Sequence, residues 1–311
     1  MKSIPLLPAV SVIIPNYNRE SLIGRAIQSV LDQTFRDFEL IIVDDGSTDQ
    51  SAAFVKTVQD SRVKLVTHPV NLGLAAAWNT GIREARSGLI AFLDSDDSWH
   101  PDKLEEQTSF LQNNPDVAGC TTGYIQSGLH RTRMVIPSQK DLELKQILFH
   151  NTLHLGTTML IHREVFDKTG PFDEILIRGQ DTDWLIRFVQ TGNLCVIPKL
   201  LATVNQHTQR SAAILEQGRI EMLKKYLQTY RNFGTLFAHR KVAKMWADVA
   251  YQYEREGNRL KMREYSLKSI SSFPIQSPGI YLILIDALTG CKLKKTASHF
   301  RQFLFRAHHQ D

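Results

Sequence analysis

The chain has 311 residues, a net charge of +5, 42% hydrophobic residues and 22% charged residues. These values are ordinary for a soluble globular protein with one large domain and an appendage. Three scattered cysteines, Cys120, Cys195 and Cys291, exclude a disulfide framework and a zinc site, so we expect free thiols in a reducing cytosol.

The apolar stretches of the chain do not read as targeting or membrane segments. Residues 4–14 carry no cleavage pattern, which argues against a secretory signal. Residues 279–288 form an apolar run of only about ten residues, against the roughly 20 that a transmembrane helix needs. The sequence therefore predicts a cytoplasmic protein.

Strand-like and helix-like segments alternate in the first half of the chain. Short apolar, β-rich runs predict strands over residues 10–14, 40–43, 63–66, 89–93 and 117–121. Amphipathic stretches predict helices over residues 20–33, 49–59, 74–85 and 102–113. This alternation predicts a Rossmann-like, mostly parallel sheet flanked by helices, with ligands bound beyond the carboxyl ends of its strands.

The alternation weakens after residue 121. The pattern predicts an irregular hairpin over 123–137, a helix over 142–149, a strand over 157–161 and a helix over 181–190. From about residue 214 the pattern is helical. We therefore expect one domain over residues 1–213 and a helical C-terminal region over 214–311.

Acidic residues follow two of the predicted strands. In a parallel sheet, segments 44–49 and 94–99 converge with segment 15–18 on one rim. That rim carries five carboxylates, on Asp44, Asp45, Asp94, Asp96 and Asp97. Clustered carboxylates repel one another unless a cation or hydrogen-bond donors occupy the site. Mg²⁺ or Mn²⁺ would suit an Asp-x-Asp loop, because Mg²⁺ takes one or two carboxylates together with substrate phosphates.

A structural interpretation competes with this metal site. Ser98 can cap a helix, and segment 44–49 can form a turn before the next helix. Asp-x-Asp alone is a weak signal, but its combination with acids at a second strand end favours a functional site.

Several blocks in order resemble the family-two inverting glycosyltransferases. They are residues 12–18, 42–49 and 92–97, with the patterns Asn71-x-Gly73 and Asn79-x-Gly81 between them. The resemblance continues through residues 170–174 and 179–183 and covers roughly residues 9–211. It implies an A-type glycosyltransferase fold, with residues 1–213 as the nucleotide-sugar-binding and catalytic domain. It also implies a nucleotide diphospho-sugar donor, which we expect to be UDP-linked, a divalent metal, Mg²⁺ or Mn²⁺, and inversion at the anomeric carbon.

The resemblance also assigns roles by position. The donor-binding positions are Pro15, Tyr17, Asp44, Asp45, Asn71, Asn79, Asp94 and Asp96. Among these, Tyr17 would offer an aromatic face to the nucleoside, Asp44 or Asp45 would bond the base, and Asp96 would be the direct metal ligand. His207 would supply a second metal ligand or touch the diphosphate, although a polar loop histidine explains it equally well.

Asp181 matches the family's general base. In a single displacement, Asp181 would take the proton of the attacking acceptor hydroxyl. An acid in the first turn of a helix is also favourable without any catalysis, and Asp183 is equally consistent with capping or positioning. Two positions depart from the family pattern: Gln180 replaces the usual Glu, and Trp78 replaces a common Arg.

Three other functions remain to be distinguished from this one. A dinucleotide-dependent oxidoreductase should have a Gly-rich turn after the first strand, and none is present. A sugar-phosphate nucleotidyltransferase should have an early Gly-rich basic loop, which is also absent. A non-catalytic nucleotide-sugar-binding protein would not need the candidate base.

The C-terminal part of the chain is basic. Residues 231–311 hold 14 Lys and Arg residues against 6 Asp and Glu residues. The stretch 291–309 predicts a basic amphipathic helix, which would suit peripheral contact with an anionic membrane surface and a lipid-linked or glycan acceptor. The alternative is that its apolar side chains dock on the catalytic domain or on a second subunit. No nucleic-acid partner is expected, and the sequence does not define an oligomeric state.

Overall fold

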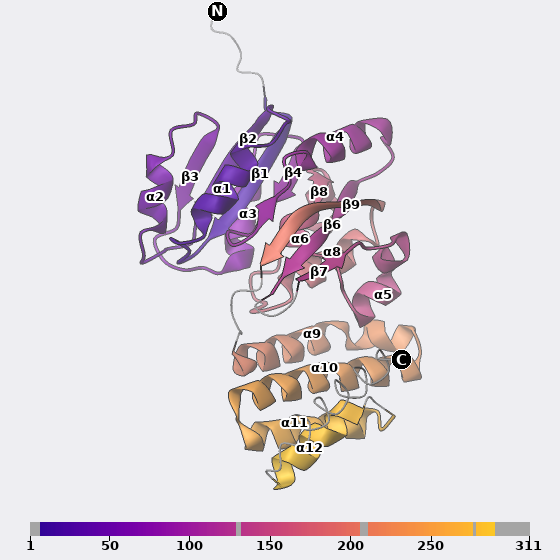
Figure 1. Ribbon diagram of the computed structural model, residues 1–311. Coiled ribbons are helices and arrows are strands. Elements are labelled where there is room, and N and C mark those ends of the chain that lie inside the picture. The colour runs from indigo at the N-terminus through magenta and orange to yellow at the C-terminus, as the bar shows by residue number, and fades with distance from the viewer. Residues whose placement is uncertain (1–6, 129–131, 206–210, 276–277, 290–311) are drawn as a thin grey trace, which may run out of the picture. The chain divides into compact units, whose positions relative to one another are not determined.

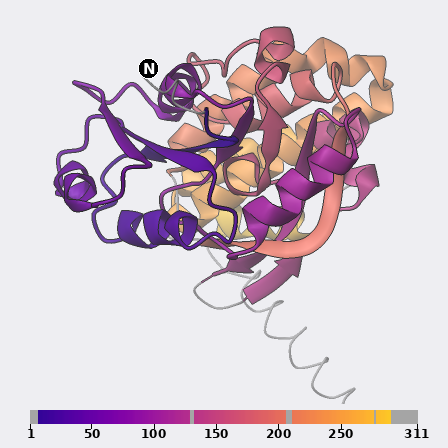
Figure 2. The same ribbon diagram turned by 90° about the horizontal axis from the view of Figure 1, so that it is seen from above.

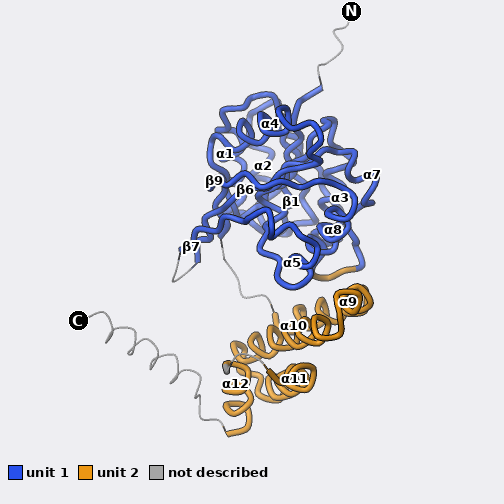
Figure 3. The backbone as a smooth tube through the Cα atoms, turned by 90° about the vertical axis from the view of Figure 1, so that its right-hand side faces the viewer, with its two compact units in different colours: residues 1–175, 179–208 blue, residues 176–178, 209–311 orange. Residues whose placement is uncertain are grey.

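The computed structural model describes residues 7–128, 132–205, 211–275 and 278–289 (Figure 1). The chain divides into two compact units, coloured separately in Figure 3. Unit 1 comprises residues 1–175 and 179–208, and unit 2 comprises residues 176–178 and 209–311. The sequence assigned the short segment 176–178 to the first domain, whereas here it groups with the helical unit.

Unit 1 is built on a mixed sheet. Its strands are β1 (Val10–Asn16), β2 (Phe38–Asp44), β3 (Val63–Thr67), β4 (Leu89–Phe92), β5 (Ser98–Trp99), β6 (Gly119–Ser127), β7 (Thr132–Val135), β8 (Leu160–His162) and β9 (Leu194–Asn205). The strand order is β3-β2-β1-β4-β8-β6-β9-β5, and β7 pairs with β6. The predicted fold class is confirmed, with a sheet that is mixed rather than purely parallel.

The direction of the strands explains where the acids meet. Strands β1, β2, β3 and β4 are mutually parallel, and β6 is parallel to β9. The antiparallel strand β8 lies between β4 and β6, so these two strands run in the same direction. The carboxyl ends of β1, β2 and β4 therefore share one rim. β7 and β5 are antiparallel additions at β6 and β9.

Helices cover both faces of this sheet (Figures 1 and 2). They are α1 (Ile23–Leu31), α2 (Ser51–Thr57), α3 (Leu74–Glu84), α4 (Lys103–Asn113), α5 (Leu144–Phe149), α6 (Leu155–Thr158), α7 (Val165–Thr169) and α8 (Gln180–Phe188), with a 3₁₀ turn, η1 (Gln139–Leu142). Alternation along β1 explains the two layers. Val12 and Ile14 join the core beneath α1, while Ile13 faces Gly81 of α3 on the other side.

Several parts of the predicted order differ from the structure, and β5 and α7 were not predicted. The predicted strand 157–161 is wrong over its first residues, because residues 155–158 form α6 and the strand begins at Leu160. Strand β9 was not predicted. It pairs with β6 through two register shifts around Gly123 and contains Pro198, and both features obscure a regular strand pattern.

Unit 2 consists of helices α9 (Ala212–Asn232), α10 (Thr235–Glu256), α11 (Arg259–Ser272) and α12 (Pro278–Thr289). The Ser211 side chain caps α9 by accepting from the Ala213 N–H, and Gly257, at φ 74°, ends α10. Segment 176–178 belongs here because the Ile177 N–H donates to Glu221 of α9. In the part of the chain that the structure describes, no helix combines the length and apolar character needed to cross a membrane. The predicted amphipathic stretch 291–309 lies outside the described residues.

Candidate active site

The ends of β1 and β2 are joined by a hydrogen-bond network. Asn16 and Asp44 are register partners, and Asn16 Nδ2 donates to Asp44 Oδ1 at 2.8 Å. The Ser47 N–H donates to the other Asp44 oxygen at 3.1 Å. Asn18 adopts a positive φ of 51°, and its Oδ1 accepts from the Thr48 N–H at 2.8 Å. Asp44 therefore holds the turn after β2, as the structural interpretation of segment 44–49 required.

Asp45 fixes the loop that follows β3. Its buried carboxylate accepts from His68 Nδ1 at 2.7 Å and from the N–H groups of Leu72 and Gly73 at 2.8 Å each. The other ring nitrogen of His68 lies 3.0 Å from Thr80 Oγ1. Three donors offset the charge of this carboxylate. The contact of Asp44 or Asp45 with a base stays a prediction, because both carboxylates already have partners within the protein.

The same loop lies directly against Gly46. Gly46 has a φ of 70°, and a Cβ atom there would come within 2.5 Å of the backbone carbonyl carbon of Val70. Asn71, in this loop, is exposed, and Tyr17, which directly follows β1, is 44% exposed. Pro15 is buried within β1. Tyr17 and Asn71 are therefore the predicted donor-binding side chains that solvent reaches here.

Asn79 is buried and connects two distant segments. Its Nδ2 donates to the Phe172 carbonyl at 2.9 Å and to Glu174 Oε1 at 2.7 Å. Its Oδ1 accepts from the Phe172 N–H at 2.9 Å. This arrangement holds residues 172–174 against α3, and the predicted role of Asn79 in donor binding stays a prediction.

The three aspartates in the loop after β4 differ in their exposure to solvent. Asp94 and Asp96 are partly exposed, whereas Asp97 is 1% exposed. The Asp97 carboxyl accepts from Thr157 Oγ1 at 2.5 Å and from the Asn205 N–H at 2.8 Å. Burial raises the pKa of this carboxyl to about 7. Asp97 therefore anchors the loop, and of its three aspartates only Asp94 and Asp96 are partly exposed.

Basic side chains flank Asp96. Arg25 of α1 donates to the Asp96 carbonyl at 2.5 Å, and Asn205 Nδ2 donates to the same carbonyl at 2.9 Å. Arg19 Nε lies 3.9 Å from Asp96 Oδ2. These contacts fix the backbone of the Asp-x-Asp loop from the side of α1 and β9.

Helix α6 closes the other side of this loop. A Cβ atom at Gly156 would lie 2.6 Å and 2.9 Å from the two carboxylate oxygens of Asp94, so only glycine leaves room for that carboxylate. One ligand atom each from Asp94, Asp97 and His154 lies within 4.8 Å of the others. Carboxylate oxygens around a space of this kind fit Mg²⁺ or Mn²⁺. The cluster includes Asp94 but not Asp96, which the sequence had assigned as the direct ligand.

Asp181 lies in the first turn of α8, which begins after Gly179 at φ 91°. Thr182 Oγ1 donates to Asp181 Oδ1 at 3.4 Å and accepts from Asn151 Nδ2 at 3.2 Å. The neighbouring Asp183 is buried and paired with Arg187 at 2.9 Å. Arg187 also donates to the Pro171 carbonyl, so Asp183 helps to hold α8 against that segment. His207 lies outside the described residues.

A family model described as "Glycosyl transferase family 2" matches residues 11–170, about half of the chain. The chain belongs to this family. Three curated relatives, uncharacterized glycosyltransferases of Haemophilus influenzae, Rickettsia prowazekii and Rickettsia typhi, are 37%, 31% and 32% identical and match over 64%, 71% and 63% of their own lengths. Another relative is WfgD of Escherichia coli, named as a UDP-Glc:alpha-D-GlcNAc-diphosphoundecaprenol beta-1,3-glucosyltransferase. It is 46% identical over 34% of this chain and 42% of WfgD.

Two solved structures share the fold of this family 2 chain. Staphylococcus aureus TarS 1–349 in complex with UDP-GlcNAc gives a TM-score of 0.58 at 18% identity, covering 90% of this chain and 92% of that one. The mannosyltransferase PcManGT from Pyrobaculum calidifontis, in complex with GDP-Man and Mn²⁺, gives 0.57 at 18% identity, covering 98% and 87%. The expected A-type glycosyltransferase fold is confirmed.

The structure explains why Trp78 stands where many members of the family have Arg. Trp78 is 2% exposed, and its ring lies 4.7 Å from that of Phe172 and 5.9 Å from that of Phe92. The position therefore belongs to an aromatic core that continues through Phe166 and Trp184. A cationic side chain at this position would have to enter that core.

Local sequence patterns contained little sign of His154 or of the α6 residues Gly156 and Thr157. His154, Gly156 and Thr157 precede an apolar run, and the sequence pattern there favoured a strand. Arg25 lay within the amphipathic pattern predicted as a helix over residues 20–33, and Arg19 lay just before it. Only their positions in the folded chain bring these side chains to the Asp-x-Asp loop.

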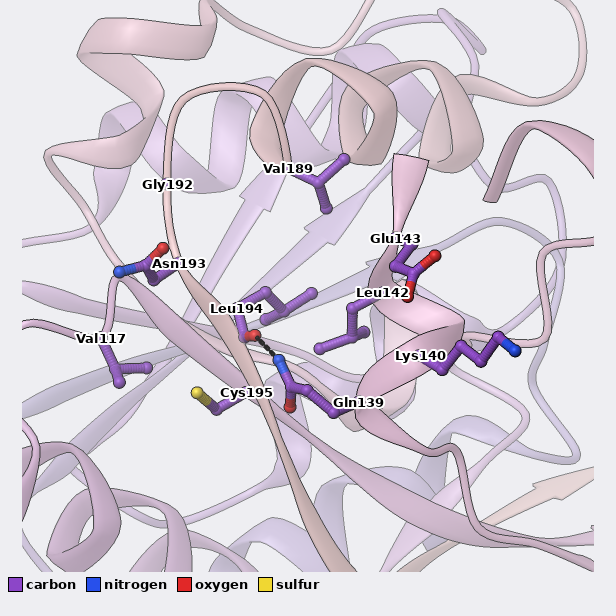
Figure 4. Close-up of a pocket in the computed structure, with 10 residues that line it drawn as sticks. All are labelled: Val117, Gln139, Lys140, Leu142, Glu143, Val189, Gly192, Asn193, Leu194 and Cys195. Carbon is purple, nitrogen blue, oxygen red and sulfur yellow. Dashed lines mark hydrogen bonds between the residues drawn. The ribbon is translucent and has the colours of Figure 1, made fainter. Parts of the chain in front are cut away.

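A cavity of about 560 Å³ opens elsewhere in unit 1, at the amino ends of β6 and β9 (Figure 4). Val117, Lys140 and Cys195 are among its lining residues. Gln139 Nε2 donates to the Leu194 carbonyl there at 2.8 Å, which covers the free edge of β9. The candidate acids lie at the carboxyl ends of the strands, so this cavity is not part of the candidate site.

Proposed function

We propose that this chain is an inverting glycosyltransferase that moves a sugar from a nucleotide diphospho-sugar to an acceptor hydroxyl. The observation that carries the proposal is the placement of Asp94 and Asp96 at the carboxyl end of β4 together with α6 and α8. Helix α6 contacts both β4 and α8, the helix that carries the candidate base Asp181 in its first turn. This arrangement supports a metal–diphosphate end and a proton-accepting end within one site.

The reaction is a single displacement. The acceptor oxygen forms a bond to the anomeric carbon while the bond from that carbon to the diphosphate oxygen breaks. Asp181 takes the hydroxyl proton, a role typically worth about 10²–10⁴ in rate. Asp94 and Asp96, with His154 nearby, would hold Mg²⁺ or Mn²⁺, which supplies charge neutralisation for the leaving diphosphate. Since the displacement has one step, no nucleophilic Ser or Cys is required.

The donor is proposed to carry uridine. WfgD is named for UDP-Glc, and TarS was solved with UDP-GlcNAc, although PcManGT was solved with GDP-Man and Mn²⁺. Exposed Tyr17 and Asn71 border the segments that Asp44 and Asp45 fix, and we assign the nucleoside to this side of the site. The bound metal of PcManGT supports a metal-assisted reaction here.

The acceptor is proposed to be a glycan or a lipid-linked sugar. The name of WfgD describes a diphosphoundecaprenol acceptor. A basic C-terminal stretch would bring the enzyme to the cytoplasmic membrane face, where such acceptors are anchored.

The test is a donor screen with purified protein. Each nucleotide-sugar is incubated with Mn²⁺ and candidate acceptors, and released nucleoside diphosphate is measured with and without chelator. We expect metal-dependent release that Asp96→Ala abolishes and the control Asp37→Ala, at the amino end of β2, leaves intact. Full activity in excess chelator would contradict a metal-dependent reaction. Donor binding without release for every acceptor would favour a binding protein, and release of pyrophosphate from a nucleoside triphosphate and a sugar phosphate would indicate a nucleotidyltransferase.

A further inference from the structure

We propose that Gly156 and Thr157 of α6 are positioning residues that set the Asp94–Asp97 loop for metal and diphosphate binding. This inference rests on the proposed function of that loop. Neither residue belongs to the sequence blocks that point to the site, and both act through the aspartates rather than on the substrate.

Thr157 joins α6 to the loop through one hydroxyl group. Thr157 Oγ1 donates to Asp97 Oδ2 at 2.5 Å, and the same oxygen lies 3.5 Å from the Asp94 backbone nitrogen. The Asp97 N–H donates back to the Asp94 carbonyl at 3.0 Å, so the three residues form a closed turn. Loss of the hydroxyl would leave a buried carboxyl oxygen without this partner, which is costly in a buried site. Thr157 therefore controls the shape of the turn that carries Asp94 and Asp96.

Gly156 controls the position of the Asp94 carboxylate. The carboxylate occupies the space that any Cβ atom at residue 156 would fill, with separations of 2.6–2.9 Å. Contacts this short between a Cβ and a carboxylate require movement of one group. Alanine at this position should therefore displace the Asp94 carboxylate, although it removes no polar group of residue 156.

The rear of α6 is held by two donors. Trp99 Nε1 donates to the Thr157 carbonyl at 2.7 Å, and Gln107 Nε2 donates to the Thr158 carbonyl at 3.0 Å. Buried Lys103 supports both donors, because its Nζ lies 4.0 Å from the Trp99 ring centre and 2.5 Å from Gln107 Oε1. A rigid rear contact makes α6 suitable for fixing a loop, since ligands must be held by groups that are themselves held.

The test compares four variants of the full chain: Thr157→Val, Thr157→Ser, Gly156→Ala and Thr158→Val. Thr158 is the matched control, because its hydroxyl contacts Thr121 and the His154 carbonyl rather than the loop. Mn²⁺ affinity is measured by calorimetry in the presence of UDP, UDP affinity is measured in chelator, and folding is checked by circular dichroism.

We expect Thr157→Val and Gly156→Ala to weaken Mn²⁺ binding by about tenfold or more, the size typical of groups that orient metal ligands. UDP affinity in chelator should stay within about threefold of the wild type, and Thr157→Ser should restore Mn²⁺ binding. Equal loss in Thr158→Val, or wild-type Mn²⁺ affinity in folded Gly156→Ala, would overturn the inference. Failure of the wild type to bind Mn²⁺ with UDP would instead refute the proposed function.

Discussion

Lys103 offers a quantitative test of the packing beneath the candidate site. Its side chain is completely buried in α4, between Trp99 and Gln107. Burial lowers the pKa of its amine from the usual 10.5 to about 7. The substitution Lys103→Met keeps most of the side-chain volume and removes the titrating group.

The size of the effect follows from this pKa. The unfolded chain holds its proton up to about pH 10.5, whereas the folded chain releases it above about pH 7. At roughly 1.4 kcal/mol per pKa unit, burial of the amine costs on the order of 5 kcal/mol below pH 7. This cost shrinks as the pH rises and is lost above about pH 10.5. In Lys103→Met, Gln107 Oε1 loses its partner, which costs about 1–3 kcal/mol.

At pH 7 itself, where about half of the folded molecules have released the proton, the cost of burial is about 4 kcal/mol. Subtracting the lost hydrogen bond, we expect Lys103→Met to be about 1–3 kcal/mol more stable than the wild type at pH 7. That advantage should shrink by about 2 kcal/mol between pH 7 and pH 9, because only the wild type releases the proton. Urea unfolding followed by tryptophan fluorescence measures both values. Exposed Lys56→Met is the control and should change stability by less than about 0.5 kcal/mol at either pH. A stability difference between wild type and Lys103→Met that is independent of pH would refute the reasoning.

Two further predictions concern the donor side and the C-terminal stretch. Gly46→Ala should lose about 1–3 kcal/mol of stability in urea unfolding, because residue 46 combines a positive φ with a close approach to Val70. The control Gly88→Ala should lose less, because the space around Gly88 is open. An equal loss in both variants would show that strain at residue 46 is not the cause. Truncation after Gly290 should abolish co-sedimentation with anionic liposomes, and binding of the full chain should weaken with salt. Equal sedimentation of full-length and truncated protein would contradict membrane contact and favour docking of that stretch on the catalytic domain or on a second subunit.

Periodicity and family blocks predicted the elements that carry the acids. Buried runs identified β1, β2 and β4 to within a few residues, because strands covered on both faces are almost continuously apolar. The order of the blocks then predicted that Tyr17, Asp45 and Asp94 belong to one rim. The structure confirms the fold that this argument required.

The environment of each acid could not be predicted in the same way. Asp94, Asp96 and Asp97 look alike in the sequence, yet only Asp97 is buried and bound by Thr157, which lies 60 residues away. The Asp45–His68 pair likewise depends on a contact across 23 residues. Hydrogen bonds of this kind depend on tertiary packing, which local patterns do not encode.

The central claim is that Asp181 accepts the proton during sugar transfer. The direct measurement is turnover of Asp181→Asn with the donor that the screen identifies, together with donor affinity by calorimetry. Asn keeps the shape of the side chain but cannot accept the proton, so turnover should fall by about 10² or more while donor affinity stays close to that of the wild type. Near-normal turnover with a collapsed donor affinity would make Asp181 a binding residue and contradict the account.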